Sequence, residues 1–280
     1  PRPEPDRIID LLEKFKPSLL PGVSTIFVAL LHSERFQKMD LSFVKAYLTG
    51  SAPMAVETIK MLKERRNVPL VNVYGLTEIT PMGTATPWGG DEKPGTVGIP
   101  LPNTDLKIVD LETGTKEMPI GEVGEICFKG PQVMTGYYKN QEETDKVLID
   151  GWLYTGDIGF MDAEGYVTIV DRKKDMILAS GFNIYPKEID ELLMTHPKVL
   201  EVCTIGIPDA YRGETVKTFV VPRPGQTLTA EEVIAFCRQT LAAYKVPKIV
   251  EFLEALPKSA VGKILRRELR DLELKKQGKG

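Results

Sequence analysis

The sequence predicts an α/β region over residues 1–103, a small β-barrel-like region over 104–170 and an α+β domain over 171–280. Three observations predict this division. Apolar strands alternate with helices up to Thr96, which is the pattern of a parallel sheet. Short strands separated by Gly and Pro follow, which indicates an antiparallel barrel or sandwich. Helices and strands mix again after Asp171, and we place the boundary at 171–174.

The first region contains a strand–helix–strand unit. Residues 6–15 form an amphipathic pattern that predicts a helix. Apolar strands are expected at 43–48 and 70–74, each followed by a turn that contains glycine, and a helix at 56–65 lies between them. Ligands bind at the carboxyl ends of parallel strands, so these turns are candidate binding sites.

The remaining elements follow from the same periodicities. The second region predicts short strands at 106–109, 125–129 and 166–170. The last region predicts helices at 186–195, 230–242 and 264–272, with strands at 199–207 and 215–221.

Composition excludes several classes of protein. The 280 residues carry 36 basic and 39 acidic side chains, which gives no reason to expect nucleic-acid binding. Cys127, Cys203 and Cys237 are scattered, which argues against a zinc site or a disulfide framework and fits a reducing, cytoplasmic compartment. The apolar stretch 19–31 is interrupted and too short to span a bilayer. Residues 1–5 do not form a signal peptide and suggest the edge of a larger protein.

The segment Tyr74-Gly75-Leu76-Thr77-Glu78 has the side chains of a nucleotide site. An aromatic ring offers a flat face to a purine, and a glycine lets a ligand approach the backbone. A threonine hydroxyl can bond a phosphate oxygen, and a glutamate can hold Mg²⁺. An isolated segment of this kind is equally compatible with a strand-to-loop turn that carries a surface glutamate.

Other candidates each have a structural alternative. Asp157, in a glycine turn, can accept the hydroxyls of a ribose or close an Asx-turn. Arg172 offers a planar fork of donors to ribose or phosphate oxygens, although a charge run is usually a solvated surface. Lys263 follows Gly262 in a loop, where a point charge could stabilise the charge that develops at an α-phosphate, or could simply be solvated.

Four segments occur in a distinctive order and spacing: 74–78, 151–157, 171–189 and 257–263. Together they closely resemble the adenylate-forming enzymes, and within them the long- or medium-chain fatty acyl-CoA synthetases. The resemblance runs from about Leu19 to Leu272. It implies a partial large domain, made of an incomplete α/β layer and a small β-barrel subdomain, followed by a mobile C-terminal α+β domain.

The resemblance also implies roles for individual residues. Tyr74 would lie beside adenine, Thr77 at the α-phosphate and Glu78 at magnesium. Lys174 would be the hinge, Gly181 would border the pantetheine channel, and Lys263 would be the catalytic lysine. The nucleotide pocket would also include Gly50, Ser51, Ala52, Pro53, Asn72, Gly75, Asp157 and Arg172, and the acyl pocket would include Val28 and Gly83. A buried structural role is an alternative for Asn72.

Two departures limit what the resemblance implies. The Thr/Ser/Gly-rich phosphate loop of the family is absent, and family members are about twice as long. Tyr154 also stands where the family often has histidine. We therefore expect a C-terminal portion of a synthetase, inactive without the N-terminal portion that contains the phosphate loop.

The resemblance implies an ATP-dependent fatty acid–CoA ligase that uses ATP, Mg²⁺ and CoA. A carboxylate and ATP would give acyl-AMP and pyrophosphate, and CoA would then displace AMP. The alternatives are an amino-acid or aryl-acid adenylation module, and a non-catalytic remnant that binds nucleotide. Peripheral contact with a membrane and oligomer formation are left open.

Overall fold

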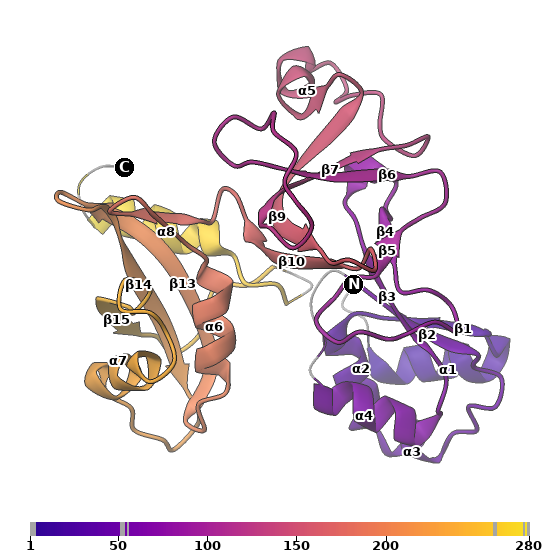
Figure 1. The fold of residues 1–280 in the computed structure, drawn as a ribbon. Helices are drawn as coiled ribbons and strands as arrows, with labels where there is room; N and C mark the ends of the chain where they lie inside the picture. The colour runs from indigo at the N-terminus through magenta and orange to yellow at the C-terminus, as the bar shows by residue number, and fades with distance from the viewer. Residues whose placement is uncertain (1–3, 51–53, 55, 260–261, 277, 279–280) are drawn as a thin grey trace. The chain divides into compact units, whose positions relative to one another are not determined.

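The computed structural model describes residues 4–50, 54, 56–259, 262–276 and 278. The chain divides into two compact units, Pro1–Ile169 and Val170–Gly280 (Figure 1). The further division of the first unit at residues 103 and 104 stays a prediction. No helix among the described residues is both long and apolar enough to cross a membrane.

The first unit begins with the predicted parallel strands. Strands β1 (Leu19–Pro21), β2 (Ala46–Thr49) and β3 (Leu70–Tyr74) run parallel, and β4 (Thr84–Ala85) and β5 (Ile99–Pro100) continue the sheet antiparallel. The predicted strand at 43–48 begins later, because Val44 N–H bonds the Leu41 carbonyl in a turn.

Four helices gather beside these strands (Figure 1). They are α1 (Pro5–Phe15), α2 (Ser24–Leu31), α3 (Glu34–Lys38) and α4 (Val56–Arg65). Their apolar sides share one core with β1 and β2, in which Phe27, Phe36 and Tyr47 are fully buried. The incomplete α/β layer that the resemblance implies predicts exposure of Ile8, Leu12 or Ile26. That prediction is wrong for Leu12, which is 4% exposed, while Ile8 and Ile26 are partly buried against the same core. The exposed apolar side chains of these elements include Leu11, Phe15, Leu19, Val28 and Val56.

A second sheet completes the first unit. Its strands are β6 (Asp105–Val109), β7 (Gly124–Lys129), β9 (Trp152–Met161) and β10 (Val167–Arg172), in the order β10-β9-β7-β6, with β8 (Leu148–Ile149) paired to β9. Helix α5 (Gln141–Val147) precedes β8. The apolar faces of these strands bury Ile126, Phe128 and Leu153. Tyr74 at the end of β3 and Leu76 just after it pack against the same cluster. This shared core brings the end of β3 beside β9.

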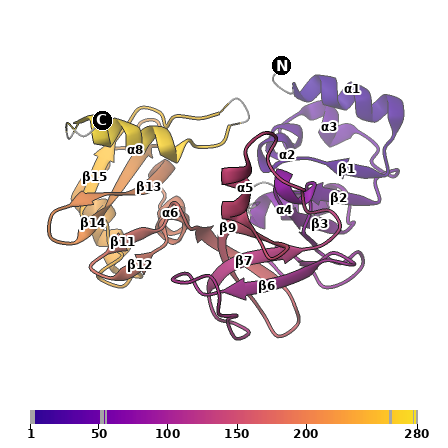
Figure 2. The ribbon, with the colours of Figure 1, turned by 90° about the horizontal axis from the view of Figure 1, so that it is seen from above.

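The second unit is a sheet covered on both faces. Its strands are β11 (Ile177–Ala179), β12 (Phe182–Ile184), β13 (Val199–Asp209), β14 (Gly213–Pro222) and β15 (Ile249–Phe252), in the order β12-β11-β14-β13 with β15 beside β14. Helices α6 (Pro186–Met194) and α7 (Ala230–Arg238) and the final helix α8 (Arg266–Lys276) lie beside it (Figure 1). Figure 2 shows α6 and α8 from above.

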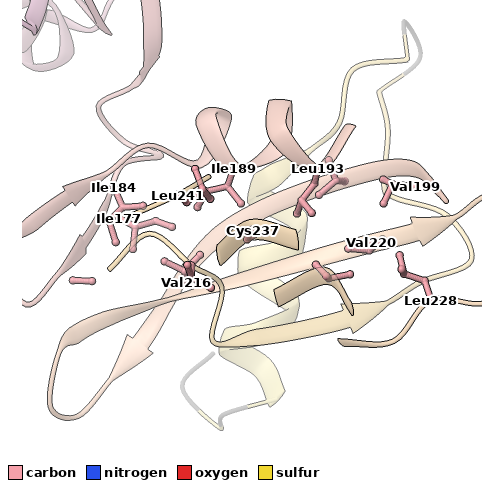
Figure 3. Packing of buried hydrophobic residues seen from close by; sticks show 14 residues of the cluster. Ile177, Ile184, Ile189, Leu193, Val199, Val216, Val220, Leu228, Cys237 and Leu241 are labelled. Atoms are coloured by element: carbon pink, nitrogen blue, oxygen red, sulfur yellow. The ribbon is translucent and has the colours of Figure 1, made fainter. Parts of the chain in front are cut away.

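Alternation along β13 and β14 explains the two covered faces. Side chains of successive strand residues point to opposite sides of a sheet. Val202 and Val220 therefore pack with Ile189 and Cys237 of α6 and α7 (Figure 3). Cys203, Ile205, Phe219 and Val221 point the other way and pack with Leu269 of α8.

Ion pairs attach α8 to this unit. Lys217 of β14 is 6% exposed, and its Nζ lies 2.6 Å from Glu251 Oε2 and 2.7 Å from Glu273 Oε2. Arg266 bonds Asp190 Oδ2 of α6 at 2.5 Å, and Arg270 bonds Asp175 Oδ1 at 2.8 Å. The helix that follows the Lys263 loop is therefore held to three other elements of its unit.

Candidate active site

Two of the predicted nucleotide residues meet at the end of β3. Tyr74 Oη donates a hydrogen bond to Asp157 Oδ2 at 2.7 Å, although the residues are 83 positions apart. Asp157 is 8% exposed, and the Tyr74 ring lies 6.1 Å from the Phe128 ring. A carboxylate has about four lone-pair sites and can accept several donors at once, a class to which ribose hydroxyls belong.

The backbone around Asp157 is fixed by neighbouring strands. Thr155 Oγ1 donates to the Ile126 carbonyl at 2.8 Å and accepts from Asp157 N–H at 3.0 Å. Gly156 has a φ of 70°, and its N–H bonds Glu125 Oε1 at 3.0 Å. Glu125 is itself buried. The supporting role of Glu125 was not predicted from the sequence, because Glu125 is one residue of strand β7 and its neighbours in sequence form no motif.

Glu78 lies in a short 3-10 turn, η1 (Thr77–Ile79), directly after the Tyr74 strand. Ile79 is fully buried and anchors the turn, while Thr77 is exposed. Gly75 is required before it, because a Cβ at that position would lie 2.1 Å from the Pro81 carbonyl oxygen. The turn thus places the exposed Thr77 and the half-buried Glu78 shortly after Tyr74.

A second tyrosine contacts Glu78. Tyr137 Oη donates to Glu78 Oε1 at 2.8 Å, and Met134 N–H donates to the Glu78 carbonyl at 2.8 Å. Partial burial, together with the hydrogen bond and charge of Glu78, raises the pKa of Tyr137 to about 12. Tyr137 is therefore a neutral donor throughout the physiological range. Sequence reasoning missed it, since the contact depends on tertiary structure.

Glu78 fits a magnesium ion shared with phosphates better than a protein-only metal site. Within residues 4–50, 54, 56–259, 262–276 and 278, no group of three or more His, Cys, Asp or Glu side chains could hold a metal ion. Mg²⁺ usually takes one or two carboxylates, substrate phosphates and waters. One accessible carboxylate beside a nucleotide-type turn meets that requirement.

The other predicted residues of the first unit are less clearly grouped. Asn72 Nδ2 donates to the Thr96 carbonyl at 2.8 Å, which supports the structural alternative for this side chain. Gly50 allows close packing, since a Cβ there would lie 2.8 Å from the Val73 carbonyl oxygen. Ser51, Ala52 and Pro53 lie outside the described residues.

The two predicted acyl-pocket residues have separate environments. Gly83 is buried, and a Cβ there would lie 2.6 Å from the Phe128 ring, so its small size makes room for that ring. Val28 is on α2 and is 39% exposed. Their common role in an acyl pocket stays a prediction.

The second unit contains the remaining predicted residues. Arg172 is the last residue of β10, Lys174 follows that strand, and both are exposed. Asp171 of the same strand accepts hydrogen bonds from Arg172 N–H at 2.8 Å and Lys187 N–H at 2.8 Å. Gly181 has a φ of 81° in the turn between β11 and β12. This turn requires left-handed backbone, and glycine adopts it without steric cost.

Lys263 is exposed at the end of a closed loop. Its N–H bonds Ser259 Oγ at 3.2 Å, and its carbonyl accepts from Ser259 N–H at 2.8 Å. Helix α8 begins three residues later, at Arg266. Lys263 is therefore tied to Ser259 through its backbone and stands three residues before α8.

Comparison with known proteins assigns the family. The family model described as AMP-binding enzyme matches residues 1–138. The family model described as AMP-binding enzyme C-terminal domain matches residues 188–263. The chain belongs to the AMP-binding enzyme family. Both matches follow the order of the motifs found in the sequence, and the chain has the partial adenylate-forming fold that those motifs imply.

Several curated relatives of this chain are named long-chain-fatty-acid–CoA ligases. The protein from Bacillus subtilis is 49% identical over 273 residues, which is 98% of this chain and 49% of the relative. The protein from Escherichia coli O6:H1 is 46% identical over 264 residues, which is 94% of this chain and 46% of the relative. The chain thus spans about half the length of these relatives.

A solved structure shares the fold. ATP-bound MatB from Rhodopseudomonas palustris matches with a TM-score of 0.86 at 37% identity, over 96% of this chain and 53% of that one. The predicted fold class is therefore confirmed. The roles of the individual site residues stay predictions.

Proposed function

We propose that this chain is part of an ATP-dependent fatty acid–CoA ligase. In the first step, a carboxylate oxygen attacks the α-phosphorus of ATP, the bond to pyrophosphate breaks, and acyl-AMP forms. In the second, the CoA sulfur attacks the acyl carbon, the bond to AMP breaks, and the thiol proton is released. Relatives that are 46–49% identical are named long-chain-fatty-acid–CoA ligases, and this supports a fatty acid as the carboxylate substrate.

The contact between Tyr74 and Asp157 gives the strongest structural support. It joins two motifs 83 positions apart into one surface, with an aromatic face and a carboxylate at 2.7 Å from its hydroxyl. We assign the adenine to the Tyr74 ring and the ribose hydroxyls to Asp157. This pairing of a flat apolar face with an acceptor is what a nucleoside requires.

Phosphate chemistry is assigned to the turn that follows. Thr77 is exposed and can donate its hydroxyl to a phosphate oxygen, and Glu78 would hold Mg²⁺, which offsets phosphate charge when bound. Lys263 would stabilise charge that develops at the α-phosphate during adenylation. Arg172 would donate to ribose or phosphate oxygens. Lys174 would be the hinge, and Gly181 would border the channel for the pantetheine of CoA.

We further propose that activity requires the part of the enzyme that precedes this chain in its relatives. The combination of this chain with that part is called the completed enzyme below. The measurement is pyrophosphate release with a panel of fatty, aryl and amino acids, for the 280-residue chain and for the completed enzyme. We expect release only from the completed enzyme and fastest with a fatty acid.

Each other outcome points to a different function. Faster release with an aryl or amino acid would identify an adenylation module of that class. Absence of release from the completed enzyme, with retained nucleotide binding, would identify a non-catalytic protein. Release from the chain alone would contradict the requirement for the preceding part.

A further inference from the structure

A phenol from a distant loop orients the carboxylate of Glu78. Tyr137 Oη donates to Glu78 Oε1 at 2.8 Å, across 59 positions of sequence. Tyr137 is 37% exposed, so its hydroxyl would be well hydrated in the absence of this bond. A hydrogen bond at a partly exposed site adds little stability on balance, because it replaces bonds to water. The contact is therefore better explained by orientation of Glu78 than by stability of the fold.

The backbone of the same loop also holds Glu78. Met134 N–H donates to the Glu78 carbonyl at 2.8 Å. The loop thus contacts both the main chain and the side chain of one residue. Two contacts of this kind restrict the backbone position and the rotamer of Glu78 together.

The backbone of Tyr137 is held by the first turn of α5. Its N–H donates to Thr144 Oγ1 at 2.9 Å, and the same hydroxyl donates to the Asn140 carbonyl at 2.8 Å. Thr144 is 5% exposed. Asn140 caps the helix, with Oδ1 accepting from Glu143 N–H at 3.2 Å. A tyrosine whose backbone is held in this way is suited to keep another side chain in place.

We propose that Tyr137 is a positioning residue for a divalent cation, and that it acts by fixing the carboxylate of Glu78. The inference rests on the proposed function, in which Glu78 holds the cation that accompanies the nucleotide. The bond to Tyr137 takes one of about four lone-pair sites and leaves acceptor capacity for the metal. Partners that orient a metal ligand typically change metal affinity 10–100-fold when they are lost.

The test measures binding of Mn²⁺ directly, by the electron paramagnetic resonance of the free ion, in the completed enzyme with a non-hydrolysable ATP analogue. Tyr137→Phe keeps the ring and removes the hydroxyl. It should weaken Mn²⁺ binding by on the order of tenfold. The matched control is Tyr138→Phe, because Tyr138 is the next residue and is 87% exposed. This control should bind Mn²⁺ as the unmodified enzyme does.

The opposite outcomes overturn the inference. Unchanged Mn²⁺ binding in Tyr137→Phe would show that the hydroxyl has no positioning role. Tighter binding would show that the hydroxyl competes with the cation for Glu78. The thermal unfolding midpoint of each variant, followed by circular dichroism, verifies that a change in Mn²⁺ binding does not result from unfolding.

A second variant separates this inference from the proposed function. Glu78→Gln removes the charge that would bind the cation. If Glu78→Gln binds Mn²⁺ normally, the assignment of Glu78 as a metal ligand fails, and the inference fails with it. If Glu78→Gln weakens binding and Tyr137→Phe does not, only the role of Tyr137 is refuted. In the double variant, Tyr137→Phe should add no loss to that of Glu78→Gln.

Discussion

Replacement of Arg266 by methionine should destabilise the second unit by an amount that grows with pH. Arg266 bonds Asp190 Oδ2 at 2.5 Å and the Thr204 carbonyl at 3.2 Å. The Asp190 side chain is 14% exposed. Methionine keeps most of the apolar volume of the arginine stem but removes both hydrogen bonds and the charge. Asp190 then has to be either neutral or an uncompensated buried charge, which is costly.

The dependence on pH follows from the ionisation of Asp190. Burial raises the pKa of Asp190 to about 7, and the attraction of Arg266 opposes this rise. In the unfolded chain the pKa of an aspartate is about 3.9. Stability therefore falls as the pH rises from about 4 to about 7, because only the unfolded state has released its proton. Above that range the unmodified protein loses no more stability from this group.

Without Arg266 the folded pKa of Asp190 rises further, so the loss continues above pH 7. Below about pH 6, Asp190 is neutral in both folded proteins, and the variant should lose only the two hydrogen bonds of Arg266, at about 1 kcal/mol each. Above about pH 7, the difference in the free energy of unfolding should increase by about 1.4 kcal/mol per pH unit.

The assay is urea unfolding from pH 5.5 to 9, followed by circular dichroism, with amide hydrogen exchange of β13 and α6 to localise the effect. Arg267→Met is the matched control, because the Arg267 side chain is 92% exposed and adjacent in sequence. Addition of Asp190→Asn to Arg266→Met should abolish the pH-dependent part. A loss that is constant across this range, or that decreases as the pH rises, would refute the reasoning.

Three further predictions concern other residues. In the completed enzyme, Lys263→Ala should slow adenylate formation by on the order of 10²-fold and transfer from supplied acyl-AMP much less; equal losses in the two half-reactions would contradict this role. Lys174→Pro fixes φ and should leave adenylation active while blocking transfer to CoA; acyl-CoA formation at the normal rate would place the hinge elsewhere. Gly75→Ala should lose about 1–3 kcal/mol in urea unfolding, because its Cβ would lie 2.1 Å from the Pro81 oxygen; unchanged stability would mean that the turn yields.

Elements with clear local boundaries were predicted best. The strand at 70–74 and the helix at 56–65 have the predicted bounds, since apolar runs and polar flanks coincide there. The helix predicted at 230–242 ends at Arg238. Leu241 N–H still bonds the Cys237 carbonyl at 2.8 Å, and Leu241 packs in the same core. The buried Leu241 continued the helical spacing of apolar residues past the end of α7, so the predicted helix was too long.

The candidate site was predictable only in part. Local chemistry indicated Tyr74, Glu78 and Asp157, and the resemblance supported their roles, but nothing in the sequence indicated that Tyr74 bonds Asp157. Strand β9 was not predicted, because its glycine-containing sequence has the composition of a turn. Tyr137 precedes the cap of α5, which is a local signal, yet its contact with Glu78 arises only when the loop folds back onto η1.

Two carboxylates of the proposed nucleotide site are each held by a phenol. Tyr74 bonds Asp157 at 2.7 Å, and Tyr137 bonds Glu78 at 2.8 Å. A lysine or arginine in either place would orient the carboxylate equally well but would also offset its charge. A neutral phenol fixes direction and leaves the negative charge available. That charge is what a cation at Glu78 requires, and it strengthens the hydrogen bonds that ribose hydroxyls would donate to Asp157. Orientation by neutral donors is therefore the arrangement expected where the bound partner supplies cations and donors of its own.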